Sequence, residues 1–289
     1  MGRVTASLDT MQDALLGWGL PLLRDLPWRR TRDPWSILVS ELMLQQTQVA
    51  RVLPKYLDFL SLYPTPAACA AVSSGDIVRA WAGLGYNRRA LNLHRAAGAV
   101  VEAGTFPSTL AGLLALPGVG PYTARAILVF AFESDVAVVD TNIARVLARL
   151  QGRSLAAPEV QRLADDLVPE GDGWAWNQVL MELGATTCTA RSWACNRCPL
   201  AVPCAWAGGD AVDPAIGSAG VSGGQSRFAG SNRQGRGRLV DALRTGSVPT
   251  VSLAKVIGWP DDRARAERVV ATLLADGLVL FENGVYRLP

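Results

Sequence analysis

The amino-acid sequence predicts a mainly α-helical protein with a small C-terminal α+β domain. Apolar residues recur at helical spacing through residues 8–207, and no stretch before residue 275 shows a convincing strand alternation. A stretch rich in Gly, Ser and Ala, residues 208–235, separates this helical body from residues 236–289. We therefore expect a helical body, a flexible linker over residues 208–235 and a separate C-terminal domain.

The helices of the body are expected between turn signals. Leu26-Pro27-Trp28 interrupts a first helix over residues 8–23, and Asp33-Pro34 opens a second helix that runs to Gln45. Turns that contain glycine separate the later helices. These are expected at residues 49–62, 74–83, 86–103, 109–115, 122–132 and 141–150.

The C-terminal part, residues 236–289, combines three short helical patterns with a hairpin. The helices are expected at residues 238–245, 252–258 and 261–275. Two apolar runs then flank Asn283-Gly284, a dipeptide typical of a two-residue hairpin turn. This order favours a winged helix-turn-helix; the alternative is a small helical cap that carries a hairpin.

The charge of the chain is close to balanced, with a formal net charge of +3. Residues 1–212 are neutral overall, and the positive excess lies in residues 213–289. A face that binds nucleic acid must therefore be local, and arginine would build it, because Lys55 and Lys255 are the only lysines among 28 basic residues. No signal sequence or membrane-spanning run is recognisable, so we expect a soluble, cytoplasmic protein. We also expect it to be a monomer.

A glycine turn, Leu116-Pro117-Gly118-Val119-Gly120, lies between two helical patterns. Gly118 and Gly120 leave their backbone amides unshielded at the start of a helix, where unpaired N–H groups and the helix dipole attract anions. The pattern indicates a phosphate-binding turn. A simple connection between two helices explains it equally well.

Four of the five cysteines lie close together in the sequence. Cys188, Cys195, Cys198 and Cys204 are spaced C-x6-C-x2-C-x5-C. Clustered cysteines in a chain without a signal peptide bind metal more often than they form disulfides. Only one close pair is present, so the spacing favours a [4Fe-4S] cluster, with a zinc ion as the alternative. Cys69 stands apart among alanines and is expected in the core.

Two carboxylates stand out by their neighbours in the sequence. Glu41 has mostly apolar neighbours three and four residues away, and loss of hydration there favours the protonated form that a general acid needs. The alternative is that Glu41 faces solvent from an otherwise buried helix. Asp140 follows an apolar run and precedes a helical pattern, so it is also a candidate helix N-cap.

Five motifs occur together, in the order SELMLQQTQV, GLGY, LPGVGPYTA, VVDTNIARVLAR and the cysteine spacing. Over residues 8–207 the chain resembles the helix-hairpin-helix DNA glycosylases of the endonuclease III superfamily, and within it the MutY-type adenine DNA glycosylases. The resemblance implies two helical lobes. One is a six-helix barrel, residues 31–140, with the hairpin at residues 114–126; the other is an iron–sulfur cluster lobe built from residues 1–30 and 141–207.

The resemblance also implies a reaction. A monofunctional glycosylase would flip adenine, mispaired with 8-oxoguanine or guanine, out of double-stranded DNA and hydrolyse its N-glycosidic bond in base excision repair. Glu41 would protonate adenine N7, and Asp140, supported by Asn142, would stabilise the oxocarbenium-like sugar. Related lyases carry a Schiff-base lysine where this chain has Tyr122, and the matching region offers only Lys55 and the α-amino group.

The resemblance assigns DNA contacts as well. Gln46 and Thr47 would fill the gap left in the base stack, and Tyr86 would be an aromatic wedge beside the opposite base. The family often has a second tyrosine next, where this chain has Asn87. The two hairpin glycines would donate backbone amides to phosphates. The adenine pocket would be lined by Trp28, Arg29 and Glu182.

The C-terminal part departs from this family. MutY-type proteins usually carry a C-terminal domain that resembles Nudix hydrolases and reads 8-oxoguanine, and residues 208–289 are too few for it. Two alternatives stay open. One is a thymine mismatch glycosylase or an endonuclease III-like lyase, of which the scarcity of lysine disfavours the lyase. The other is a non-catalytic, cluster-containing DNA-binding regulator, which the presence of both carboxylates disfavours.

Overall fold

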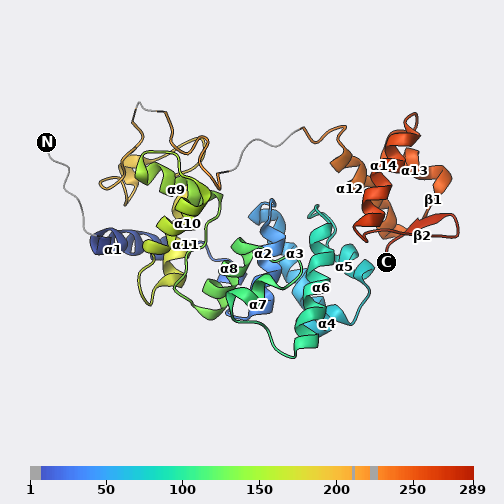
Figure 1. Ribbon diagram of the computed structural model, residues 1–289, viewed down its shortest axis with the longest axis horizontal. Coiled ribbons are helices and arrows are strands. Elements are labelled where there is room, and N and C mark those ends of the chain that lie inside the picture. Colours follow the sequence, from blue (N-terminus) through green and yellow to red (C-terminus); the bar gives the residue numbers. More distant parts are fainter. Residues whose placement is uncertain (1–7, 210–211, 222–226) are drawn as a thin grey trace. The chain divides into compact units, whose positions relative to one another are not determined.

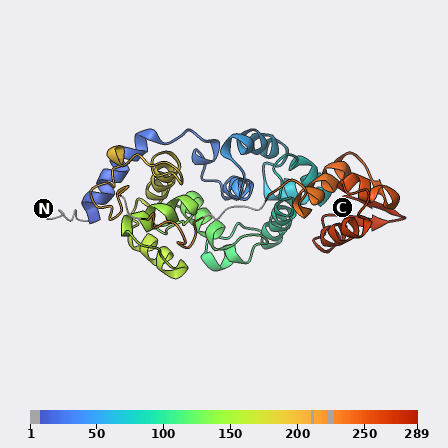
Figure 2. The same ribbon diagram turned by 90° about the horizontal axis from the view of Figure 1, so that it is seen from above.

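The computed structural model describes residues 8–209, 212–221 and 227–289, and its mainly α-helical fold with one small sheet confirms the expected fold class (Figures 1 and 2). The chain forms two compact units. Unit 1 contains Met1–Ile37, Ser108–Leu110 and Gly120–Gly224, and unit 2 contains Leu38–Pro107, Ala111–Val119 and Gln225–Pro289. The domain boundaries expected from the sequence stay a prediction. Residues 1–7, 210–211 and 222–226 of those domains lie outside the described residues.

Unit 1 is organised around helix α11, Gly173–Thr186. This helix packs against α9 (Thr141–Gln151), α1 (Leu8–Gly19) and α8 (Pro121–Phe132), and α10 (Ala157–Asp166) packs against α9. Apolar side chains from these helices form one core and are almost fully buried, among them Leu15, Leu147, Trp176, Val179 and Leu183. Burial of this apolar surface is what holds the unit together.

Helices α9 and α11 approach each other closely at Gly184. A β-carbon at Gly184 would lie 2.6 Å from the β-carbon of Asn142, which is closer than real atoms come. Glycine at this position therefore lets α11 lie against the first turn of α9, the turn that carries Asp140 and Asn142.

Unit 2 contains the greater part of α2 (Pro34–Leu44), then α3 (Val49–Leu62), α4 (Pro66–Ala70), α5 (Ser74–Ala80) and α6 (Arg88–Ala103). Helix α6 packs against α4 and α5. The core includes Cys69, which is fully buried as expected, and burial raises the pKa of its thiol to about 12. A thiol with this pKa is inert at neutral pH, so Cys69 is a packing residue.

The C-terminal domain belongs to unit 2 and has the elements predicted for it. Helices α12 (Asn232–Thr245), α13 (Leu253–Ile257) and α14 (Arg263–Ala275) precede the hairpin of β2 (Leu280–Glu282) and β3 (Val285–Arg287). Asn283 and Gly284 both have positive φ, at 50° and 77°, as a type I′ hairpin turn requires. A two-residue strand, Val248–Pro249, pairs with β3 and was not predicted, because two residues carry no readable alternation.

Part of the predicted linker is bonded to unit 1. The carboxylate of Asp213 accepts hydrogen bonds from Nε and Nη2 of Arg149, at 3.1 Å and 2.6 Å. The amide of Ala219 donates to the carbonyl of Leu155 at 2.9 Å. Residues 212–221 are therefore held in place, although their composition is that of a flexible linker.

Where the sequence predicted boundaries of body helices, the observed ones lie close to them; no boundaries were predicted for α10 and α11. The first α-helix ends at Gly19 and a 3₁₀ turn, Leu20–Leu22, continues it, while Pro66–Ala70 is a short helix that the sequence analysis did not predict. No helix in the described part of the chain is long and apolar enough to cross a membrane.

Candidate active site and metal centre

Asp140 lies at the N-terminus of α9 and caps it. Its Oδ1 accepts hydrogen bonds from the backbone amides of Asn142 at 2.9 Å and Ile143 at 2.7 Å. Burial raises the pKa of Asp140 above its usual value, and these hydrogen bonds oppose the rise. The carboxylate is thus desolvated and held in one orientation, which is the condition for strong electrostatic action on a nearby charge.

A second layer of bonds holds the side chain that supports Asp140. Asn142 Nδ2 donates to Asp140 Oδ2 at 2.8 Å, and Asn142 Oδ1 accepts from Arg145 Nη2 at 2.9 Å. The same Arg145 nitrogen donates to the carbonyl of Gly184 at 2.6 Å. Because arginine can only donate, it fixes which end of the Asn142 amide faces Asp140. Arg145 lies one helical turn after Asn142, and this spacing is the signal that the sequence analysis missed.

Glu41 lies on α2 and is buried, with 6% of its surface exposed. Its neighbours Leu38, Leu42 and Met43 are at most 1% exposed. Of the two alternatives, a buried carboxyl among apolar side chains is therefore the observed one. Its catalytic role stays a prediction. Glu41 belongs to unit 2 and Asp140 to unit 1.

The two hairpin glycines occupy a tight turn and the N-cap of the helix that follows it. Gly118 has φ of 81°, and a β-carbon there would lie 2.5 Å from the β-carbon of Asn92, so only glycine fits. Gly120 is the N-cap of α8, and a β-carbon on it would meet nothing within 4 Å. Tyr122 follows in the first turn of α8 and is half-buried. Phosphate binding by these amides stays a prediction.

Two loops of unit 2 hold residues in the left-handed backbone region that non-glycine residues avoid. Gln46 has φ of 55° and is exposed, and Tyr86 has φ of 46° with 43% of its surface exposed. Such conformations cost free energy and cluster at functional sites. Thr47 is half-buried beside Gln46. We name residues 44–47 and 83–88 the two reading loops.

Arg89 joins the two reading loops, and the sequence analysis did not identify it. It is 8% exposed, and burial lowers its pKa to about 10, so it stays charged at neutral pH. Its two terminal nitrogens donate at 2.6–3.1 Å to acceptors on both loops and in the last turn of α2. The acceptors are the carbonyls of Leu42, Met43, Gln45, Leu84 and Gly85 and the hydroxyl of Thr47.

The residues expected in an adenine pocket lie in unit 1, and two of them contact each other. Arg29 Nη2 donates to Glu182 Oε2 at 2.9 Å, and Arg24 Nε donates to Glu182 Oε1 at 2.7 Å. Glu182 is 1% exposed, and Trp28 is buried with 7% exposed. Desolvation lowers the pKa of Arg29, and Glu182 opposes this. The pair offers buried, charged groups with fixed orientation; contact with a base stays a prediction.

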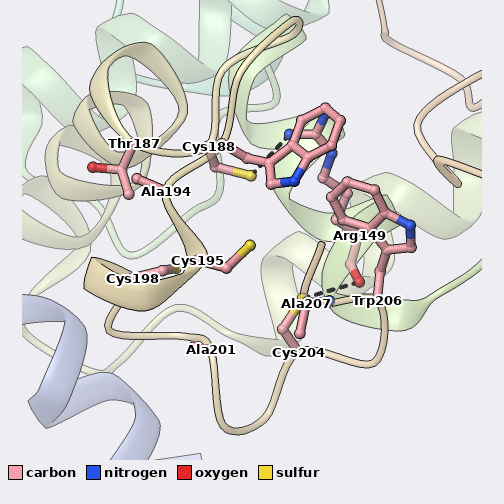
Figure 3. A pocket seen from close by; sticks show the side chains of 11 residues that line it. Arg149, Thr187, Cys188, Ala194, Cys195, Cys198, Ala201, Cys204, Trp206 and Ala207 are labelled. Atoms are coloured by element: carbon pink, nitrogen blue, oxygen red, sulfur yellow. Dashed lines mark hydrogen bonds between the residues drawn. The ribbon is translucent and has the colours of Figure 1, made fainter. Parts of the chain in front are cut away.

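The four clustered cysteines line one pocket of unit 1, and none forms a disulfide. Figure 3 shows Cys188, Cys195 and Cys204 at different sides of this pocket, with Arg149 and Trp206 along one side. The described residues contain no group of three or more His, Cys, Asp or Glu side chains already set as metal ligands. The fit to a metal group therefore rests on the chemistry of the donors, which are four thiols from one short segment.

Two of the four sulfurs accept N–H hydrogen bonds, which stabilise negative charge on sulfur. Arg149 Nη1 donates to Cys188 Sγ, and the amide of Ala207 donates to Cys204 Sγ, both at 3.2 Å. Burial and the neighbouring thiols raise the pKa of Cys198 to about 11. Four thiolates around one pocket would need a metal cation to balance their charge, and N–H donors to sulfur are the usual second layer of such sites.

Comparisons with known proteins place these features in context. Residues 39–170 match the family described as HhH-GPD superfamily base excision DNA repair protein. The chain is 45% identical over 300 residues to an adenine DNA glycosylase of Mycobacterium tuberculosis, covering 99% of this chain and 96% of that protein. An adenine DNA glycosylase of Homo sapiens is 39% identical over 219 residues, covering 70% of this chain and 40% of the human protein.

Two solved structures are also similar to this chain. A thermostable thymine-DNA glycosylase has a TM-score of 0.66 at 31% identity, covering 70% of this chain and 96% of that one. An endonuclease III in a non-covalent DNA complex has a TM-score of 0.61 at 23% identity, over 70% of this chain and 97% of the other, and this likeness concerns the fold.

Proposed function

Since the chain belongs to the adenine DNA glycosylase family of the HhH-GPD superfamily, we propose that it removes adenine mispaired with 8-oxoguanine or guanine from DNA. One observation of the structure carries the chemistry: the carboxylate of Asp140 is fixed by Asn142 and by the start of α9. The reaction is hydrolysis of the N-glycosidic bond after the base has been flipped out of the duplex. The product is an abasic site.

The two carboxylates would have different roles, one as a general acid and the other as a stabiliser of positive charge. Glu41, buried among apolar side chains, is the proposed acid that protonates adenine N7 and makes the base a better leaving group. Asp140 is the proposed partner of the oxocarbenium-like sugar. The positive charge that develops there favours the ionised carboxylate and so offsets the effect of burial on Asp140.

The remaining predicted residues would bind DNA. Gln46, Thr47 and Tyr86 on the reading loops are proposed to replace the flipped base in the stack and to contact the opposite base. The amides at Gly118 and Gly120 are proposed to bind phosphate. The proposed adenine pocket is lined by Trp28, Arg29 and Glu182.

A monofunctional reaction follows from the residue at the lyase position. Tyr122 cannot form a Schiff base with the sugar, and arginine rarely acts as a nucleophile. Lys55 lies near the second reading loop, since a β-carbon on Gly83 would lie 4.0 Å from its Cε. Borohydride should therefore trap no covalent complex with DNA. A trapped complex that Lys55→Arg abolishes would refute the monofunctional proposal.

The four cysteines are proposed to hold a [4Fe-4S] cluster, with zinc as the alternative. Their donor set fits, because the four thiols line one pocket and two sulfurs already accept N–H bonds. With all ligand positions filled by cysteine, the cluster would stabilise the fold of residues 187–207. Its proposed role is structural. Metal analysis and visible absorption of the purified protein distinguish iron from zinc.

The test of the proposed function is a comparison of duplexes. The protein is incubated with duplexes containing A:8-oxoguanine, A:G, T:G or thymine glycol, and strand breaks are compared with and without hot alkali. Release of adenine, with breaks only after alkali, is expected. Base loss on none of the duplexes would refute the enzyme and favour a DNA-binding regulator.

A second candidate is a thymine mismatch glycosylase, which the structural likeness to a thymine-DNA glycosylase favours. Thymine has no N7 to protonate, so the buried acid Glu41 has no use in that reaction. The T:G duplex in the same assay separates the two candidates. Release of thymine without release of adenine would replace the first proposal by the second.

A further inference from the structure

An open groove in unit 2 lies between the reading loops and the C-terminal domain. It encloses an empty volume of about 2160 Å³, part of which is open to solvent. Helices α12 and α14 contribute one side, and residues of both reading loops contribute the other. Six arginines and only two aspartates line it, so the groove is basic although the chain is nearly neutral.

The arginines of the groove have different surroundings. Arg236 and Arg244 are paired with Asp276 and Asp241, so acidic neighbours balance their charges. Arg233, in the first turn of α12, contacts two aromatic side chains. Its Nη1 donates to the hydroxyl of Tyr86 at 3.3 Å, and its guanidinium carbon is 6.0 Å from the centre of the Phe228 ring.

Both of these aromatic rings are exposed. Tyr86 is 43% exposed and Phe228 is 57% exposed, and both line the groove. Large exposed rings beside an arginine are typical of surfaces that bind unpaired nucleotides, because the rings stack on bases and the guanidinium binds phosphate. The groove therefore has the chemistry of a nucleic-acid site.

The C-terminal domain is bonded to the second reading loop itself. Arg244 Nη2 donates to Asn87 Oδ1 at 2.8 Å, and Arg244 Nε donates to the carbonyl of Val78 at 3.1 Å. The amide of Gly75 donates to the carbonyl of Pro289 at 3.1 Å. These bonds fix α12 relative to the loop that carries Tyr86, so the two sides of the groove form one surface.

We propose that α12 and the loop of residues 83–88 form a single site for the DNA strand opposite the adenine. Arg233 binds a phosphate of that strand, and Phe228 stacks on an unpaired base beside Tyr86. Arg244 is a positioning residue that holds the loop through Asn87. The assignment of the strand rests on the proposed function, because Tyr86 is placed beside the opposite base there; the binding of DNA rests on the groove alone.

The first test removes the phosphate contact. Full-length Arg233→Ala is compared with Arg268→Ala, which removes one exposed arginine of the same domain outside the groove. Binding to an undamaged duplex and to an A:8-oxoguanine duplex with an uncleavable 2′-fluoro adenosine is measured at several salt concentrations. We expect Arg233→Ala to bind both duplexes about tenfold more weakly. The slope of the logarithm of the binding constant against the logarithm of salt concentration should fall in magnitude by about one. Arg268→Ala should bind both duplexes like the wild-type protein.

Equal binding by the two variants would overturn the proposal and leave the groove to another partner. The undamaged duplex keeps this result separate from the proposed function. If the wild-type protein binds DNA but releases no adenine, the glycosylase proposal fails, and the comparison of Arg233→Ala with Arg268→Ala still decides whether the groove binds DNA.

The second test assigns the strand. Single methylphosphonates, which remove one phosphate charge, are placed near the mispair in either strand. At one position of the opposite strand, the methylphosphonate should weaken DNA binding by the wild-type protein. It should not change binding by Arg233→Ala, because that variant has already lost the phosphate contact. The same loss of effect in the adenine strand, or in neither strand, would overturn the assignment. Phe228→Ala should weaken binding of the mispaired duplex about tenfold and that of the undamaged duplex less; equal losses would remove Phe228 from the site.

Discussion

The first turn of α9 and the two reading loops position their residues by different means. Asp140 is held by backbone amides of a regular helix and by Asn142, its neighbour two residues away. The reading loops are mostly turns between helices, carry Gln46 and Tyr86 in left-handed conformations, and are bonded together by one buried side chain, Arg89. A site held by a helix terminus should tolerate substitutions that keep the cap, whereas loops held by one arginine should not tolerate its loss.

The largest effect is expected from removing charge at the helix site while keeping its geometry. Asn is as good an N-cap as Asp, so Asp140→Asn should keep α9 intact and lose the negative charge. We expect adenine release in single turnover to fall about 10³-fold, with DNA binding retained. Asp13→Asn on the exposed face of α1 is the matched control. A loss below tenfold would mean that Asp140 is only a cap.

Removal of one clustered cysteine should affect the structure of unit 1 and leave that of unit 2 unchanged. Cys198→Ala removes a proposed cluster ligand, and we expect loss of visible absorption and a fall in unfolding free energy of several kcal/mol. Cys69→Ala, at a cysteine in the core of unit 2, is the control and should keep the absorption. Hydrogen exchange should rise in residues 187–207 and not in the reading loops. An unchanged iron content in Cys198→Ala would contradict the ligand set.

Loss of Arg89 should disturb the structure of the reading loops and thereby lower the stability of the protein. Arg89→Met leaves five carbonyls and one hydroxyl without their donor, and we expect an unfolding free energy lower by about 2–4 kcal/mol. Binding of mispaired DNA should weaken about tenfold. Arg89→Lys keeps the charge but cannot reach all acceptors. Its stability and DNA binding should therefore lie between those of Arg89→Met and the wild-type protein. Denaturant unfolding with equal stability of Arg89→Met and wild type would show that the loops need no anchor.

The smallest effect is a pH dependence at Asp140. Burial raises the pKa of this carboxyl in the folded protein, so its ionised form costs stability once the pH exceeds the unfolded value near 3.9. Asp140→Asn should therefore be slightly more stable than wild type at pH 7, and the difference should vanish as the pH falls below that value. Thermal unfolding from pH 3 to pH 8 measures this. A variant less stable than wild type at pH 7 would show that the cap needs the charge.

The sequence predicted those features whose residues lie close together along the chain. Asp140 and Asn142 lie two residues apart in one motif, the cysteines share a short window, and a single residue separates the hairpin glycines. Arg89 and Asp213 were missed because their partners lie about 40 to 60 residues away, and many arginines of the chain would have fitted equally well. Composition misled at residues 212–221, where small polar residues bind backbone groups of unit 1 instead of forming a free linker.

The shared anchor at Arg89 also determines how the reading loops open. A guanidinium bonded to both loops cannot release one loop without disturbing its bonds to the other. The two loops should therefore open as one cooperative unit rather than as two independent segments. A single opening rate, set by the release of one buried charge, should therefore govern both loops.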